Sequence, residues 1–162
     1  MTGRRRALAA TLLTMLLAAC AQVPRESAAS GEVRSGRLAL SVADQPGQSF
    51  SAGFELRGRP EAGELALLNP LGGVLALLRW QPGSATLDTP GRDTQRFPSL
   101  DVMVQQATGA PLPVTALFDW LAGTNTPVPG WEADLSQLAD GRIRAVRRDP
   151  PPQADLRVVL DR

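Results

Sequence analysis

Apolar and polar side chains alternate along residues 37–57 of the chain. The apolar positions of this alternation are Leu38, Leu40, Val42, Phe50, Ala52, Phe54 and Leu56. A period of two is typical of strands with one buried face, as in antiparallel sheets. The polar segment 44–48 contains Pro46 and Gly47, so it predicts a hairpin connection between two such strands.

Residues 64–81 are apolar at nearly every position and are interrupted by the turn Asn69-Pro70-Leu71-Gly72-Gly73. A proline and two glycines disfavour a continuous helix, so we expect two strands, 64–69 and 74–81. Proline presets one φ angle of a turn and glycine accepts a positive one, but this geometry does not require a leucine. Leu71 is therefore either an inert exposed residue or a functional one.

The rest of the pattern predicts four more strands and two helices. The strands are expected at 85–88, around 95–96, at 142–148 and at 156–160. The first helix has Ser99 as its N-cap and ends at Gly109, and the second begins with Pro113 as its first residue and ends at Gly123. The expected fold is mainly β: a curved antiparallel sheet with two short helices inserted. Such a sheet encloses either a ligand cavity or an ordinary packed core, and the pattern fits both.

The N-terminus has the features of an export signal. Three arginines, Arg4 to Arg6, precede the short apolar run 7–19, and small residues precede Cys20. The segment "LAAC" resembles the bacterial lipobox, which implies cleavage after residue 19 and lipidation of Cys20. Ala21 stands where an aspartate would retain a lipoprotein in the inner membrane, which implies anchoring in the outer membrane, facing the periplasm. Residues 20–34 then form the lipidated cysteine and a flexible tether, and residues 35–162 form the domain.

The composition disfavours most catalytic chemistry. The chain has no histidine, lysine or tyrosine and a single cysteine, so Ser-His-Asp, Cys-His and His/Cys metal sites are excluded. Without the signal, 14 basic and 16 acidic residues remain, which gives no reason to expect nucleic acid as a partner. The carboxylate pairs Asp88/Asp93 and Asp134/Asp140 lie in turn-like segments where solvated acids are common. We therefore expect a binding protein, with no catalytic residue, metal or cofactor.

Two motifs give the chain a family resemblance between Ser35 and Trp131. One is Asn69-Pro70-Leu71-Gly72 between two apolar strands, and the other is "TGxPLPxxxLxxWLxG" at residues 108–123. The chain resembles the LolB family of outer-membrane lipoprotein receptors. The resemblance implies an incomplete antiparallel β-barrel wrapped around a helical lid, with an apolar cavity for lipoprotein acyl chains. It also implies that the chain, as a monomer, accepts lipoproteins from the periplasmic carrier LolA and inserts them into outer-membrane phospholipid without ATP.

The resemblance also assigns roles to residues. The membrane-engaging loop comprises Asn69, Pro70, Leu71 and Gly72, with Leu71 entering the bilayer. The expected cavity lining comprises Leu38, Leu40, Phe50, Phe54, Leu56, Leu67 and Leu77. The expected lid residues are Val104, Leu117, Trp120 and Leu121. A one-residue shift in register would exchange the two faces of any strand. The alternative is a structural envelope lipoprotein that scaffolds an assembly and has no ligand cavity.

Overall fold

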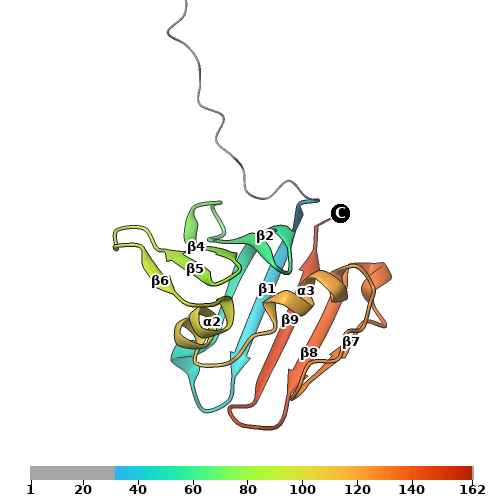
Figure 1. Ribbon diagram of the computed structural model, residues 1–162. Coiled ribbons are helices and arrows are strands. Elements are labelled where there is room, and N and C mark those ends of the chain that lie inside the picture. The colour runs from blue at the N-terminus through green and yellow to red at the C-terminus, as the bar shows by residue number, and fades with distance from the viewer. Residues whose placement is uncertain (1–31, 162) are drawn as a thin grey trace, which may run out of the picture.

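Two antiparallel meanders form one nine-stranded sheet in the computed structural model, which describes residues 32–161 (Figure 1). The strands are β1 (Arg34–Val42), β2 (Phe50–Arg59), β3 (Ala62–Leu68), β4 (Val74–Gln81), β5 (Ser84–Asp88), β6 (Gln95–Phe97), β7 (Trp131–Asp134), β8 (Arg142–Arg147) and β9 (Ala154–Leu160). Their order across the sheet is β6-β5-β4-β3-β2-β1-β9-β8-β7. The first six strands run outward to one edge, and the last three run back from the other edge until β9 pairs with β1.

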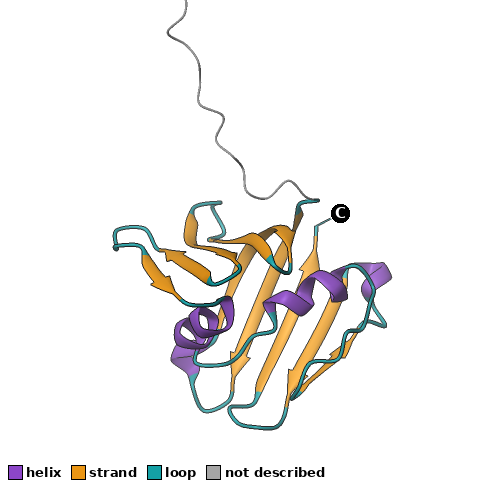
Figure 2. Cartoon of the chain, viewed as in Figure 1, coloured by secondary structure: helices purple, strands orange, loops and turns teal. Residues whose placement is uncertain are grey.

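The segment between the two edge strands contains both α-helices, α2 (Leu100–Thr108) and α3 (Val114–Leu121). Because it leaves the sheet at β6 and re-enters at β7, it must cross one face of the sheet. Figure 2 shows both helices on that face, with the strands curving around them. The edge strands do not pair with each other, so the sheet stays open. The predicted fold, a mainly β incomplete barrel around a helical lid, is confirmed.

The helix boundaries follow from their capping residues. The Ser99 side chain accepts a hydrogen bond from the Val102 amide at 3.3 Å, and Gly109 ends α2 in the left-handed conformation with φ 68°. Both assignments agree with the sequence prediction. Pro113, predicted as the first residue of the second helix, instead precedes it, and α3 begins at Val114. The backbone of Pro113, at ψ 64°, is not helical, which explains the one-residue difference.

The core lies between the concave face of the sheet and the helices. Its largest fully buried side chains are Trp120, Leu40, Leu56 and Met103. Trp80 on β4 joins the sheet to α3, because its ring meets Phe118 edge-on with centroids 6.1 Å apart. Its Nε1 donates a hydrogen bond to the Pro60 carbonyl at 2.9 Å. Gly63 on β3 lies directly beneath this ring, where a β-carbon would overlap it.

Some elements were not predicted from the pattern. The strand β7 has four residues and β8 is its one neighbouring strand in the described sheet, and four residues are too few to show a period of two. The short 3₁₀ helices η1 (Pro46–Gln48) and η2 (Leu138–Asp140) lie in connections. β1 and β9 each begin before the expected residue, at Arg34 and Ala154, because Arg34 pairs with Leu56 of β2 and Ala154 pairs with Val42 of β1.

Candidate functional site

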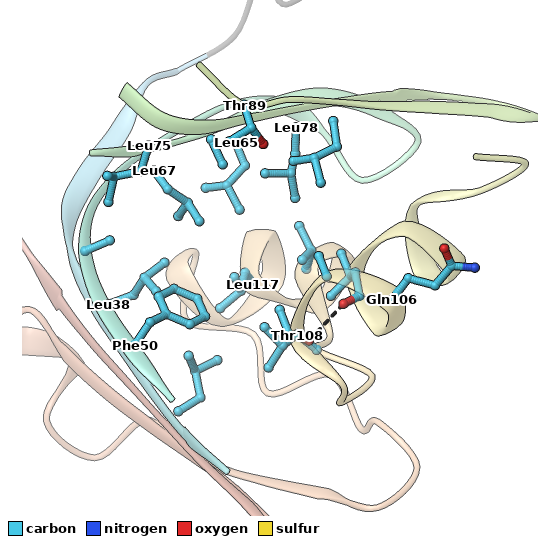
Figure 3. A pocket seen from close by; sticks show the side chains of 18 of the residues that line it. Leu38, Phe50, Leu65, Leu67, Leu75, Leu78, Thr89, Gln106, Thr108 and Leu117 are labelled. Atoms are coloured by element: carbon cyan, nitrogen blue, oxygen red, sulfur yellow. Dashed lines mark hydrogen bonds between the residues drawn. The ribbon is translucent and has the colours of Figure 1, made fainter. Parts of the chain in front are cut away.

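A cavity of about 540 Å³ lies between the curved sheet and the two helices (Figure 3). Its apolar lining comprises Leu38, Phe50, Ala52, Leu65, Leu67, Leu75, Ala76, Leu78, Leu87, Val104, Ala107, Leu112, Pro113, Val114, Leu117 and Leu156. Its polar lining comprises Ser51, Thr89, Arg92, Gln95, Gln106 and Thr108. The volume falls within the roughly 300–1,000 Å³ that is usual for ligand sites, and the predominance of aliphatic side chains suits an apolar ligand.

Five of the residues expected at an acyl-chain site line this cavity. They are Leu38, Phe50 and Leu67 from the sheet and Val104 and Leu117 from the helices. In Figure 3 the side chains of Leu38, Phe50 and Leu67 lie on the sheet side, and Leu117 lies on the helix opposite them. The structure therefore brings residues from β1, β2, β3, α2 and α3 around one space.

The other six expected residues lie elsewhere. Leu40, Phe54 and Leu56 are buried in the core rather than at the cavity wall. Trp120 and Leu121 are also core residues, and the Trp120 Nε1 donates to the Thr126 carbonyl at 3.0 Å.

Leu77 lies on the opposite face of the sheet from the cavity. Its cross-strand partners are Ala66 and Asp88, whereas Leu78 and Ala76 on either side of it line the cavity. Because residues 64–81 are apolar on both faces, the sequence pattern did not identify the inner one. The pairing of Leu65 with Leu78 and of Leu67 with Ala76 identifies it in the structure.

The turn between β3 and β4 presents Leu71 to solvent on a hydrogen-bonded backbone. Leu71 is 95% exposed. The Asn69 Oδ1 accepts hydrogen bonds from the amides of Leu71 and Gly73, each at 2.9 Å. Two further backbone bonds close the turn, from Asn69 N to Gly73 O at 2.8 Å and from Gly72 N to Asn69 O at 2.9 Å. Gly72 has a φ of 82°, so the turn uses its glycine as the sequence predicted.

The exposed hairpin and the cavity are continuous. Val74 and Leu75 follow the turn and are each 45% exposed. Leu75 also lines the cavity, so one side chain belongs to both surfaces. Leu75 thus joins the cavity wall to the hairpin whose tip is Leu71.

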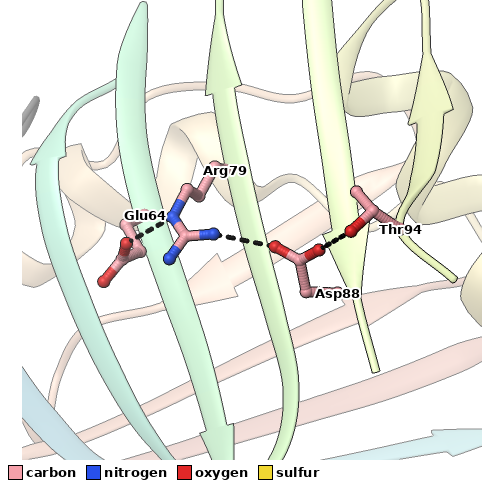
Figure 4. A network of polar contacts seen from close by, with 4 residues as sticks. All are labelled: Glu64, Arg79, Asp88 and Thr94. Carbon is pink, nitrogen blue, oxygen red and sulfur yellow. Dashed lines mark hydrogen bonds and ion pairs between the residues drawn. The ribbon is translucent and has the colours of Figure 1, made fainter. Parts of the chain in front are cut away.

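A polar network on the other face of the sheet supports this end of the molecule (Figure 4). Arg79 on β4 donates to Glu64 on β3 at 2.9 Å and to Asp88 on β5 at 2.7 Å. Asp88 also accepts a hydrogen bond from the Thr94 hydroxyl, which closes the base of the loop between β5 and β6. Asp88 is thus part of a structural network that joins three strands and a loop.

The second carboxylate pair considered above is also held in structural contacts. The backbone amide of Ser136 donates to Asp134 at 2.9 Å, and hydrogen bonds from Ser136 hold the pKa of Asp134 below its ordinary value. Within residues 32–161, no cluster of three or more acidic, histidine or cysteine side chains could hold a metal ion. In the same part of the chain, the helices are too short to cross a bilayer. Cys20 and the segment before residue 32 lie outside the described residues.

The open curved sheet, its helical cover and the apolar cavity form an architecture that suits a binding protein for apolar ligands. The model of the family described as "Outer membrane lipoprotein LolB" matches residues 33–154. The outer-membrane lipoprotein LolB of Bordetella petrii is 36% identical over 91% of this chain and 88% of its own length. That of Cupriavidus pinatubonensis is 34% identical over 91% of this chain and 73% of its own length. The chain belongs to the LolB family, whose members act in lipoprotein localisation at the outer membrane and are not enzymes.

Proposed function

We propose that this protein accepts lipoproteins from the periplasmic carrier LolA, holds their acyl chains in the cavity, and inserts them into the outer membrane. The protein itself is anchored at the periplasmic face of that membrane by lipid on Cys20. The observation that carries the proposal is the position of Leu75, which is half-exposed on the hairpin and also lines the cavity. A cavity without this connection would suit storage of a ligand better than its delivery.

The cavity can supply the free energy of binding. Each methylene removed from water contributes about 0.8 kcal/mol, so an acyl chain gains several kcal/mol within aliphatic walls. A bilayer offers an acyl chain the same gain in free energy without enclosing it. The acyl chain therefore leaves the cavity when the cavity opens directly into lipid. Transfer without ATP therefore depends on where the cavity opens.

The exposed side chain of Leu71 supports the proposed step of insertion into the membrane. Burying one leucine side chain contributes roughly 1.5–3 kcal/mol, which is too little to anchor a protein but enough to orient one that is already tethered. The bonds from Asn69 hold the turn before it meets the membrane. Little conformational entropy is then lost when Leu71 enters the bilayer.

The test separates acceptance of cargo from delivery. Leu71→Glu should leave folding and acceptance from the carrier nearly unchanged, because the side chain is exposed and is not part of the cavity wall. Delivery to liposomes should fall sharply, because an ionised carboxylate resists entering the apolar interface. A carrier-to-receptor-to-liposome assay measures both steps for the same preparation.

Leu71→Ile is the matched control. It keeps the apolar volume and should deliver cargo nearly as well as the native protein. Equal loss of acceptance and delivery in Leu71→Glu, or no loss of either, would overturn the role of Leu71. A protein that only scaffolds an envelope assembly would accept no cargo in any of the three forms.

A further inference from the structure

Arg92 is the one charged residue among those that line the cavity in the described chain. It lies in the loop between β5 and β6 and is exposed, so it stands where the cavity opens to solvent. Among residues 32–161, no side chain forms an ion pair or hydrogen bond with its guanidinium group. An arginine side chain without an ionic partner in the described structure therefore borders a cavity whose other lining residues are uncharged.

The surrounding acids explain why Arg92 has no partner. Asp88, at the base of the same loop, is bound by Arg79 and Thr94 on the outer face of the sheet. Asp93 follows Arg92 directly but does not come within ion-pair distance of it in the described structure. The Arg92 amide donates to the Thr89 carbonyl at 3.1 Å, and Gly91 has a φ of 76°, so a turn fixes the backbone that carries the side chain.

Apolar walls with a single guanidinium at the opening match one kind of ligand, an amphiphile with an anionic head group. The planar guanidinium binds phosphate through two parallel hydrogen bonds, which suits a phosphodiester particularly well. A cysteine that carries three acyl chains has neither a free amine nor a phosphate, so its lipid offers Arg92 no ionic partner. The residue is thus unexplained by lipoprotein cargo alone.

We propose that the cavity also takes a phospholipid, with its acyl chain against the aliphatic walls and its phosphate on Arg92. This inference rests on the proposed function, because it requires that the cavity holds acyl chains. A bilayer phospholipid bound in this way keeps the walls out of water after cargo has left. Cargo and membrane lipid then compete for one site, and the outer membrane itself promotes release.

The test compares two amphiphiles that share a chain and differ in charge. The chain with Cys20→Ala, which carries no acyl group of its own, is loaded with a fluorescent apolar probe. The probe is then displaced by lauroyl lysophosphatidylglycerol, by monolaurin or by inorganic phosphate, with both amphiphiles kept below their micellar concentrations. We expect the anionic amphiphile to bind about tenfold more tightly than monolaurin, which corresponds to one charge-assisted hydrogen-bonded contact.

The variants assign this preference to one side chain. Arg92→Gln should bring the two affinities together and leave monolaurin binding unchanged, which also shows that the variant is folded. Arg96→Gln is the control, because Arg96 is also exposed but lies on the opposite side of β6 from Gln95, a cavity residue. It should keep the preference. Inorganic phosphate should displace nothing, because it gains no apolar burial.

The outcomes separate this inference from the function on which it rests. Equal affinities of the native protein for both amphiphiles, or a preference that survives Arg92→Gln, would overturn the phospholipid site and leave acyl binding in place. Displacement by inorganic phosphate at the same concentration would assign Arg92 to free anions instead of lipids. If neither amphiphile displaces the probe, both the phospholipid site and the acyl-binding function fail.

Discussion

At the scale of single residues, two side chains occupy environments opposite to their chemistry. Leu71 is 95% exposed, whereas Arg147 on β8 is only 6% exposed. The Nε and Nη1 of Arg147 are buried without a hydrogen-bond partner in the described structure. The unpaired donors of Arg147 reduce stability, and no contact in the structure explains this buried arginine. The exposed leucine has a use in the proposed function, at the membrane.

Arg147→Met should stabilise the domain. The substitution keeps a long apolar stem and removes a buried group whose donors are unpaired, a defect that costs about 1–3 kcal/mol. The free energy of unfolding should rise by that amount in a urea titration, with a higher midpoint of thermal unfolding.

The neighbouring residue provides the comparison. Arg148→Met removes an exposed arginine whose Nη1 lies 2.9 Å from Glu132, and such a surface pair contributes about 0–1 kcal/mol. Stability should therefore change little or fall slightly. A fall in stability for Arg147→Met would show that its guanidinium finds partners in solution.

At the scale of elements, the end of α2 depends on a close contact. Gly109 ends the helix with φ 68°, and a β-carbon at this position would overlap the side-chain amide of Gln48 from the first hairpin connection. The glycine thus permits both the left-handed conformation and the packing of the hairpin against the helix. This contact places the end of α2 against the connection between β1 and β2.

Gly109→Ala should destabilise the domain more than Gly83→Ala. Both glycines have positive φ, which costs a non-glycine residue about 1–2 kcal/mol. No atom lies within 4 Å of a β-carbon at Gly83, so only the backbone term applies there. Gly109→Ala adds overpacking against Gln48, roughly 1–3 kcal/mol more. Urea titrations of the two variants measure the difference, and equal losses would show that Gln48 moves away freely.

The elements also show what could be read from the sequence. Period-two alternation at Leu38, Leu40 and Phe54 predicted the strands and which of their residues share a face, because each strand has one polar face. Alternation gave no information at Leu77, because both faces of that strand are apolar. Only the pairing of β4 with β3 and β5 shows which face Leu77 occupies. The sequence also could not distinguish cavity-lining residues from core residues. Leu38 and Leu40 share a strand face, but Leu38 lines the cavity and Leu40 lies in the core, and only the position of the helices decides this.

At the scale of the whole molecule, the topology places the cover over the sheet. The chain must travel from β6 at one edge to β7 at the other, and the connection that crosses the concave face contains α2 and α3. The caps at Ser99 and Gly109 predicted a helix but not this crossing, because strand order depends on contacts distant in sequence. The pairing of β1 with β9 is such a contact.

The lipid anchor should be an aid to delivery and not a requirement for acceptance. A tether raises the local concentration of the protein at the membrane but adds no contact to the cavity. A Cys20→Ala chain exported with a cleavable signal should accept cargo from the carrier as well as the native protein, and should deliver it more slowly. Combining Cys20→Ala with Leu71→Glu should abolish delivery. Failure of the folded, unanchored protein to accept cargo would contradict the receptor function.

The unjoined edges of the sheet determine how the interior can adapt to its contents. In a closed barrel, strand number and stagger fix the radius, and a larger content can enter only by breaking ladders. Here β6 and β7 share no ladder, so small changes of twist between neighbouring strands can flatten the wall while every backbone pair remains intact. Residues 98–130, which contain α2 and α3, connect the two edge strands. Under the proposed function, we expect longer or more numerous acyl chains to be accommodated by elastic bending, so that one protein could serve cargo whose lipids differ in length.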